Sequence, residues 1–239
     1  INFQLVNSNI NGLLIDNNGM GVFTPPPTSN FNISLNFAGG LTPSQQLIFA
    51  DAVQRWQDII IGDLPDVGPI DDVLISASGV PIDGVGGILG QAGPTGLRPG
   101  SFLPFQGIMQ FDTADLTALE NSGQLADVIL HEMAHVLGAG TIWQNLGLLT
   151  GAGTADPRFI GPLATAEYNA RFNVNEAGAP VENTGGPGTR DAHWRESVFT
   201  NELMTGFLNP GVNPISLVTI AHFEDLGYQV DMTQADPFL

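Results

Sequence analysis

The sequence contains no cysteine and no lysine. The lack of cysteine in 239 residues excludes disulfide bonds, thiolate zinc sites and a cysteine nucleophile. The chain has 6 basic residues, all arginine, against 24 acidic ones, and its formal net charge of −18 makes nucleic acids and anionic membranes unsuitable partners. No apolar run approaches the roughly 18 residues that a membrane span requires, so we expect none.

The chain begins with Ile1-Asn2-Phe3-Gln4, which has neither an initiator methionine nor the basic-then-apolar order of a signal peptide. We therefore expect a processed start. The acidic composition and the lack of cysteine favour a secreted, extracellular protein, which we expect to be bacterial and monomeric. Residues 1–30 are rich in Asn, Gly and Pro, and they predict an irregular lead-in with one short strand.

Hydrophobic periodicity predicts the elements of the first half. Residues 31–37 alternate apolar and polar side chains, as a half-buried strand does. Thr42 followed by Pro43 is typical of a helix start, and the apolar spacing beyond them continues this helix to Gly62. Further strands are expected at 72–77, 87–92 and 107–111, with a Gly- and Pro-rich loop at 93–104.

The second half is predicted to hold helices and loops. Apolar residues recur at helical spacing over 122–137, and Gly138 is the expected C-terminal cap. A short helix is expected around 163–172 and a loop over 181–191. The last helix is predicted to begin at Asn213-Pro214, to run to about Leu226 and to end at Gly227.

These elements predict a single α+β domain over residues 1–239. Its N-terminal subdomain, residues 1–138, is expected to hold a mixed twisted sheet with two long helices and to end with the second of them. Its C-terminal subdomain, residues 139–239, is expected to be helical and rich in loops. We expect a cleft between the two subdomains.

The segment His131-Glu132-Met133-Ala134-His135 lies inside the helix predicted over 122–137. Two histidines at i and i+4 point from one helix face, so both imidazoles can reach one zinc ion. Glu132 can act as general base on a zinc-activated water and pass the proton to the leaving amine. The pattern therefore predicts a zinc-dependent endopeptidase that hydrolyses peptide bonds in proteins or peptides.

A catalytic zinc site needs a third protein ligand. The compact metzincin pattern has a glycine three residues after the second histidine and a third histidine six residues after it. Here Gly138 occupies the first position and Thr141 the second. Of the remaining histidines we favour His193, which follows a Gly-rich loop, over His222, which lies in the last predicted helix. Met204, shortly after His193, fits the Met-turn of metzincins.

Two further hypotheses stay open. Glu167 or Glu176 can complete a two-histidine, one-glutamate zinc site, although this leaves Gly138 and Met204 unexplained. Alternatively, the chain is a non-catalytic, zinc-stabilised extracellular binding or adhesion domain. The intact Glu132 argues against this reading, because a domain without catalysis has no use for a general base.

Calcium is also left open as a second metal. Several aspartates gather in predicted loops, namely Asp63, Asp66, Asp71, Asp72 and Asp83. Their spacing matches neither an EF-hand nor a Gly-Asp nonapeptide repeat, so we assign no calcium ligands.

The run from His131 to Gly138 resembles the helix motif of the leishmanolysin family of metzincins. That family has a long insertion before its third histidine, and the gap from Gly138 to His193 is similar. Its later landmarks look like His193-Trp194, Glu202-Leu203-Met204 and the run from Phe223 to Tyr228, and a looser similarity extends over 31–230. The resemblance implies a metzincin fold with the zinc ligands His131, His135 and His193, the base Glu132 and the Met-turn residue Met204.

The chain also departs from the family pattern. It has no cysteine and no anchor, as expected of a pared-down bacterial relative, and a cysteine switch cannot operate within it. Some metzincins place a tyrosine two residues after the methionine as an extra ligand or oxyanion partner. Gly206 occupies that position, so no such role is assigned.

The resemblance also implies how a substrate would bind. Metzincins bind an extended peptide along an exposed edge strand, which we expect at Gly87-Ile88-Leu89-Gly90; an ordinary edge strand blunted by glycine is the alternative. The inserted stretch 141–192 is expected to wall the cleft. Arg190 and Arg195 flank His193 and can pair with nearby carboxylates.

Overall fold

The computed structural model describes residues 13–15, 21–23 and 30–238. The first half alternates strands and helices: β1 (Leu13–Ile15), β2 (Gly21–Phe23), β3 (Ile33–Phe37), α1 (Pro43–Ile59), β4 (Val73–Val80), β5 (Gly90–Leu97), β6 (Pro104–Asp112), α2 (Leu116–Ser122) and α3 (Leu125–Val136). The second half holds shorter elements: β7 (Leu149–Thr150), β8 (Arg158–Phe159), α4 (Pro162–Phe172), β9 (Ala179–Pro180), α5 (Glu196–Phe199), α6 (Leu217–Leu226) and the 3₁₀ helix η1 (Met232–Gln234). The predicted α+β class is confirmed.

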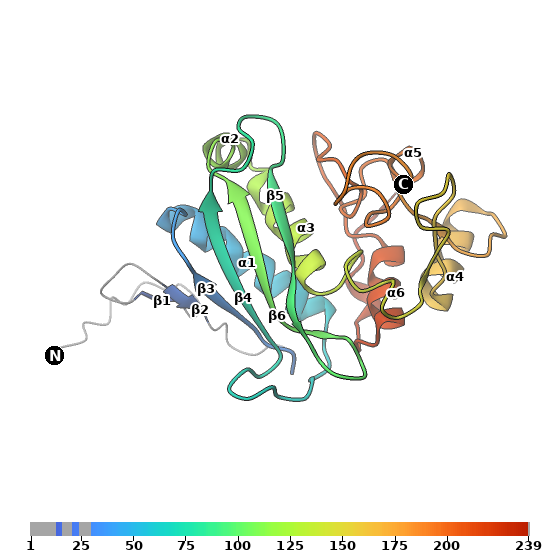
Figure 1. Cartoon of the computed structure of the whole chain (residues 1–239), viewed down its shortest axis with the longest axis horizontal. Coiled ribbons are helices and arrows are strands. Elements are labelled where there is room, and N and C mark those ends of the chain that lie inside the picture. Colours follow the sequence, from blue (N-terminus) through green and yellow to red (C-terminus); the bar gives the residue numbers. More distant parts are fainter. Residues whose placement is uncertain (1–12, 16–20, 24–29, 239) are drawn as a thin grey trace.

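The main sheet has the strand order β1-β2-β3-β4-β6-β5 within the described residues. Strands β3, β4 and β6 are parallel to one another, and the register aligns Ile75 with Leu35 on one side and with Gly107 on the other. Strand β5 pairs antiparallel with β6 and forms an edge of the sheet that also lies against α3 (Figure 1). The predicted mixed sheet is therefore confirmed, and one of its edges runs beside the helix that carries the two predicted histidine ligands.

Helix α1 begins where the sequence predicted. The Thr42 hydroxyl accepts a hydrogen bond from the Gln45 N–H, and the Gln45 side chain accepts one from the Thr42 N–H, which completes a capping box. On the buried face, the Phe49 ring packs edge-to-face between Phe37 and Phe111 of the sheet, with centroid distances of 5.3 and 5.4 Å. Aromatic packing therefore joins α1 to the sheet.

Helix α3 packs against both α1 and the sheet. The indole N–H of Trp56 in α1 donates to the Leu130 carbonyl in α3 at 3.1 Å. Gly107 in β6 lets α3 approach closely, because a Cβ atom there would lie 2.4 Å from Val136 Cγ1. These contacts set the height of α3 over the sheet and hence the position of the residues along its exposed face.

The C-terminal half is built around stacked aromatic side chains. The Trp194 indole stacks on Trp143 at 5.2 Å and on the Phe199 ring at 5.4 Å, and Phe159 packs edge-on at 5.6 Å. Helices α4 and α6 pack against each other, and Figure 1 shows this half beside the sheet. No helix in the described part of the chain is long and apolar enough to span a membrane. The subdomain border at residue 138 stays a prediction.

The prediction of a loop over 93–104 is wrong in its first part. Strand β5 begins at Gly90 and continues to Leu97, whereas residues 87–89 precede it. Pro94 is tolerated because β5 is an edge strand, where the missing N–H costs least, and register shifts around Gly96 absorb the irregularity. The glycine and proline content of residues 93–97 is typical of a loop, but pairing with β6 stabilises a strand there.

Two helix predictions also need correction. The last helix begins at Leu217 with Ser216 as N-cap, whose hydroxyl accepts from the Thr219 N–H at 3.2 Å; Asn213 instead donates its side-chain amide to Asp127. Helix α2 (Leu116–Ser122) was not predicted, and the helix expected from residue 122 begins at Leu125, after a left-handed turn at Gly123. Within the predicted lead-in, residues 13–15 and 21–23 form β1 and β2, and the remainder before residue 30 lies outside the described residues.

Gly39 and Gly40 offer a matched test of the packing between the loop before α1 and β4. Both have positive φ, +104° and +77°, but only a Cβ on Gly40 would collide with a neighbour, at 1.9 Å from the Gly79 carbonyl oxygen. We expect Gly39→Ala to lower the free energy of unfolding by about 1 kcal/mol. Gly40→Ala should lower it by about 3 kcal/mol, because backbone must move as well. Urea unfolding at pH 7 measures both, and equal losses would contradict the packing argument.

Candidate metal centre

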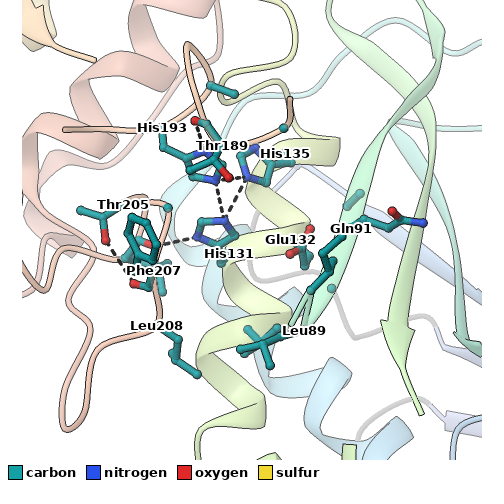
Figure 2. Close-up of a pocket in the computed structure, with 18 of the residues that line it drawn as sticks. Leu89, Gln91, His131, Glu132, His135, Thr189, His193, Thr205, Phe207 and Leu208 are labelled. Carbon is teal, nitrogen blue, oxygen red and sulfur yellow. Dashed lines mark hydrogen bonds between the residues drawn. The ribbon is translucent and has the colours of Figure 1, made fainter. Parts of the chain in front are cut away.

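Helix α3 presents the central residues of the site. His131 and His135 are one turn apart, so both imidazoles project from the face that looks away from the sheet, as Figure 2 shows. The opposite face is anchored by fully buried apolar side chains, among them Ile129, Met133 and Val136. Burial of this second face holds the helix in place and leaves the histidine face to line a cleft.

His193 reaches the two helical histidines from a loop 58 residues further on. Gly140, with φ +71°, brings the chain after α3 against this loop: a Cβ on it would lie 2.1 Å from the Ala192 carbonyl oxygen. On the other side, the Trp194 N–H donates to the Met204 carbonyl at 2.9 Å. His193 is therefore held between two backbone contacts, one on each side of it in the sequence.

The three imidazoles meet through their Nε2 atoms, and each of the three Nε2–Nε2 distances is 3.0 Å (Figure 2). Each Nδ1 lies within hydrogen-bond distance of a backbone carbonyl: His131 with Leu203 at 2.7 Å, His135 with Ala139 at 2.8 Å and His193 with Thr189 at 2.9 Å. A carbonyl can only accept, so every Nδ1 carries the proton. In the neutral rings, every Nε2 then presents a lone pair to the other two.

Three converging lone pairs repel one another unless a cation lies between them. Burial lowers the pKa of His131 to about 3, with a further contribution from His135, and it lowers the pKa of His193 well below its ordinary value, so protonation is disfavoured. The centre of a triangle with 3.0 Å edges is about 1.7 Å from each corner, slightly less than the usual zinc–nitrogen distance of about 2.0–2.1 Å. One small ion could therefore contact all three nitrogens, so these residues would hold zinc.

Glu132 lies beside the triad in the same cleft, on the side toward β5 (Figure 2). The cleft has a volume of about 500 Å³ and is bordered by residues 87–92 on one side and by the loops around Thr189 and Thr205 on the other. The side chain packs closely against Gly90, where an added Cβ would lie 3.0 Å from Glu132 Cγ. Burial raises the pKa of the Glu132 carboxyl to about 8.

Met204 is buried in the turn whose preceding residue, Leu203, offers its carbonyl to His131. This turn depends on Glu202, whose carboxylate is fully buried and accepts from the Met204 N–H at 2.6 Å, from the Ser216 N–H at 3.0 Å and from the Ser216 and Thr219 hydroxyls. Glu202 therefore ties the turn to the start of α6. The sequence showed Glu202 only as a neighbour of the methionine, because no local pattern marks a buried, hydrogen-bonded carboxylate.

The geometry agrees with a comparison against known families. The leishmanolysin family profile matches residues 66–239, which are 174 of the 239 residues. The chain belongs to the leishmanolysin family of metallopeptidases. The resemblance seen in the sequence is confirmed, and the zinc dependence of this family agrees with the fit of the three histidines to zinc.

Relatives of the chain are larger proteins. It is 29% identical over 150 residues to the ciliated left-right organizer metallopeptidase of Xenopus laevis, which covers 54% of this chain and 21% of that protein. It is 29% identical over 133 residues to a leishmanolysin homolog of Crithidia fasciculata, an alignment that covers 52% of this chain and 20% of that protein. It is 38% identical over 81 residues to a leishmanolysin-like peptidase of Drosophila melanogaster, an alignment that covers 33% of this chain and 12% of that protein. The aligned part thus amounts to about a fifth or less of the length of these three relatives.

His222 lies outside the group formed by His131, His135 and His193. Its imidazole lies in the aromatic core, with ring centroids 4.3 Å from Phe223 and 5.8 Å from Trp143, and its Nδ1 donates to the Thr219 carbonyl. The alternative ligands also lie elsewhere: Glu167 is not among the residues that line the cleft, and Glu176 is 3.7 Å from Arg158.

The two arginines beside His193 have structural partners. Arg195 pairs with Asp156 at 2.9 Å and donates to the Val181 and Pro157 carbonyls, and Arg190 lies 3.9 Å from Asp191. Arg195 thus joins the segment after His193 to the residues that flank β8 and β9, and Arg190 donates to the Thr154 carbonyl.

The predicted substrate strand borders the cleft. All of Gly87, Ile88, Leu89 and Gly90 line it, although only Gly90 belongs to β5.

The acidic loop residues do not support calcium. Asp63, Asp71 and Asp72 lie within 4.8 Å of one another, but both oxygens of Asp72 already accept backbone N–H groups, from Asn32 and Leu64 at 2.6 Å each. Burial raises the pKa of Asp72 to about 6, and its backbone hydrogen bonds only partly offset this. Asp72 is thus a structural side chain that joins two loops.

Gly140 and Gly147 provide a matched test of how His193 is positioned. Both have positive φ, +71° and +67°, but a Cβ on Gly147 would meet nothing within 4 Å, whereas one on Gly140 would displace Ala192, the neighbour of His193. We expect Gly140→Ala to weaken zinc binding about 10- to 100-fold, and Gly147→Ala to leave it unchanged. Competition with a chromophoric chelator measures both affinities. Equal affinities would show that the Gly140–Ala192 contact does not position the ligand.

Proposed function

We propose that this chain is a zinc-dependent endopeptidase of the metzincin type, with His131, His135 and His193 as zinc ligands. The observation that carries the proposal is the meeting of three Nε2 lone pairs at 3.0 Å beside a carboxylate, in a cleft open to substrate. Membership of the leishmanolysin family supports the same chemistry. Zinc bound there supplies a Lewis acid that polarises the scissile carbonyl and makes water more acidic.

Glu132 is the proposed general base. Two influences act on its carboxyl group: burial favours the protonated form, while a cation held by the neighbouring histidines favours the carboxylate. Their opposition lets one group accept a proton from the attacking water and then release it to the leaving amine. Gly90 supports this role, because a side chain there would press on the Glu132 methylene groups.

The substrate is proposed to bind as an extended peptide along the edge that begins at Gly87 and continues into β5. Residues 87–90 line the cleft next to Glu132, and β5 is the outermost strand in the described order of the sheet. Main-chain hydrogen bonds to an edge strand bind many sequences, and the side chains that line the cleft then select among them.

Met204 is proposed as the residue of a Met-turn. It is buried directly after Leu203, whose carbonyl orients His131, and its own carbonyl accepts from the Trp194 N–H next to His193. The turn thus contacts the His131 ring directly and, through Trp194, the backbone next to His193. Secretion, a bacterial source and a monomeric state complete the proposal, and they rest on the acidic, cysteine-free composition.

The third ligand is tested by comparing His193 with His222. His193→Ala removes an Nε2 donor, so we expect the purified variant to lose most of its zinc and its peptidase activity. His222→Asn keeps a side-chain N–H for the Thr219 carbonyl and should retain both. Metal analysis by mass spectrometry and hydrolysis of casein provide the readouts. Full zinc content in His193→Ala would overturn the proposed ligand set.

Glu132→Gln tests the general base and separates an enzyme from a zinc-stabilised binding domain. Glutamine has the size of glutamate but cannot accept the proton, so kcat should fall by about 10²–10⁴-fold or more, while zinc stays bound. Chelator-sensitive casein hydrolysis by the unaltered protein is the reference. A protein that binds zinc but cleaves neither casein nor gelatin would support the binding-domain alternative instead.

A further inference from the structure

The cleft continues beyond the histidines toward the start of α3. Asp127 precedes His131 by one turn, so it lies on the same stripe of the helix as His131 and His135, about 6 Å further along the axis. Asp127 and Val128 both line the cleft. Along α3 the cleft floor therefore passes from the two helical histidines to a carboxylate within one or two turns.

The walls of this end of the cleft are apolar. Leu89 and Leu208 approach from opposite sides of α3 below His131, and Phe207 lies above Leu208 (Figure 2). Phe207 is 54% exposed although it is a large aromatic side chain, so it is available to cover a bound group. Asn213 also lines the cleft. The result is an apolar passage with an acidic end, which suits a long side chain with a polar head.

The Asp127 carboxylate has no cationic partner in the part of the chain that the structure describes. Its hydrogen-bond donor is the Asn213 amide, at 2.9 Å to Oδ2, and no other donor is found for Oδ1 among these residues. Arg55 borders a neighbouring cavity that Asp127 also lines, but that guanidinium pairs with Asp236 at 3.0 Å. Burial raises the pKa of Asp127, so a cation at Oδ1 would relieve an existing cost.

The charges of the cleft also favour a substrate with a basic side chain. Of its described lining residues, Asp127 and Glu132 are the acidic ones, and none is arginine. The net charge of −18 adds a long-range attraction for basic peptides. Glu132 would pass its proton to the leaving amine, so the substrate residue that carries this amine lies nearest to Glu132, beside Val128 and Asp127.

We propose that Asp127 is a specificity-determining residue, and that the enzyme prefers peptides with lysine or arginine on the amine side of the cleaved bond. The alkyl part of that side chain packs between Leu89 and Leu208, and its cationic head reaches the Asp127 carboxylate, which Asn213 holds in place. This inference rests on the proposed peptidase function of the same cleft.

The test is a set of four kcat/KM values. Two peptides differ at the residue on the amine side of the cleaved bond, which is lysine in one and norleucine, of similar length without the charge, in the other. The protein is either unaltered or Asp127→Asn, which retains an oxygen to accept from Asn213 and removes only the charge. We expect the unaltered enzyme to favour the lysine peptide, and Asp127→Asn to reduce that preference about 10- to 100-fold.

Asp66→Asn is the matched control, because Asp66 is exposed and lines neither the cleft nor the neighbouring cavity, and its substitution changes the net charge equally. It should leave the lysine preference intact. All three proteins should contain the same amount of zinc. Equal cleavage of both peptides by the unaltered enzyme, or a lysine preference that Asp127→Asn leaves unchanged, overturns the inference while the peptidase function stands. A protein that binds zinc and cleaves neither peptide nor casein refutes the proposed function and this inference with it.

Discussion

The site depends on three hydrogen bonds from imidazole Nδ1 groups to backbone carbonyls. These bonds fix the tautomer of His131, His135 and His193, and they direct three Nε2 lone pairs to one point. The carbonyls belong to Leu203, Ala139 and Thr189, in three separate segments of the chain. Because the three imidazoles cannot converge unless all three segments are in place, the loops around the cleft are part of the candidate metal centre.

The second half of the fold can be understood as the support of these carbonyls. Glu202, fully buried, accepts hydrogen bonds from the turn at Met204 and from the start of α6, and these only partly offset the cost of burying its charge, so its pKa is raised. Trp194 joins the same network through its indole N–H, which donates to Thr219, and through its stacking on Trp143 and Phe199. The aromatic core and the buried carboxylate together hold the turn that contacts His131.

The first half of the fold positions helix α3, which carries Glu132, beside strand β5. Helix α3 packs beside α1 and on the sheet through apolar side chains, so the stripe that carries His131 and His135 is held in place before any ligand binds. Strand β5 approaches so closely that Gly90 lies opposite Glu132, which places a sheet edge and the proposed general base side by side. A rigid helix and an exposed strand edge are what an extended peptide needs beside a metal ion.

The sequence by itself determined the features that depend on local spacing. The i and i+4 histidines on a helix, the cap of α1 at Thr42, the alternation of β3 and the final glycine of α6 follow from periods of 3.6 and 2 and from cap chemistry. Only the tertiary structure decided which distant groups meet. It placed His193, and not His222, next to His131 and His135, and it extended β5 through Gly93–Leu97. It also showed that Glu202 is a buried carboxylate that holds the turn at Met204, and that Asp127 lines the cleft. These depend on contacts between segments far apart in the chain, and no local pattern carries that information.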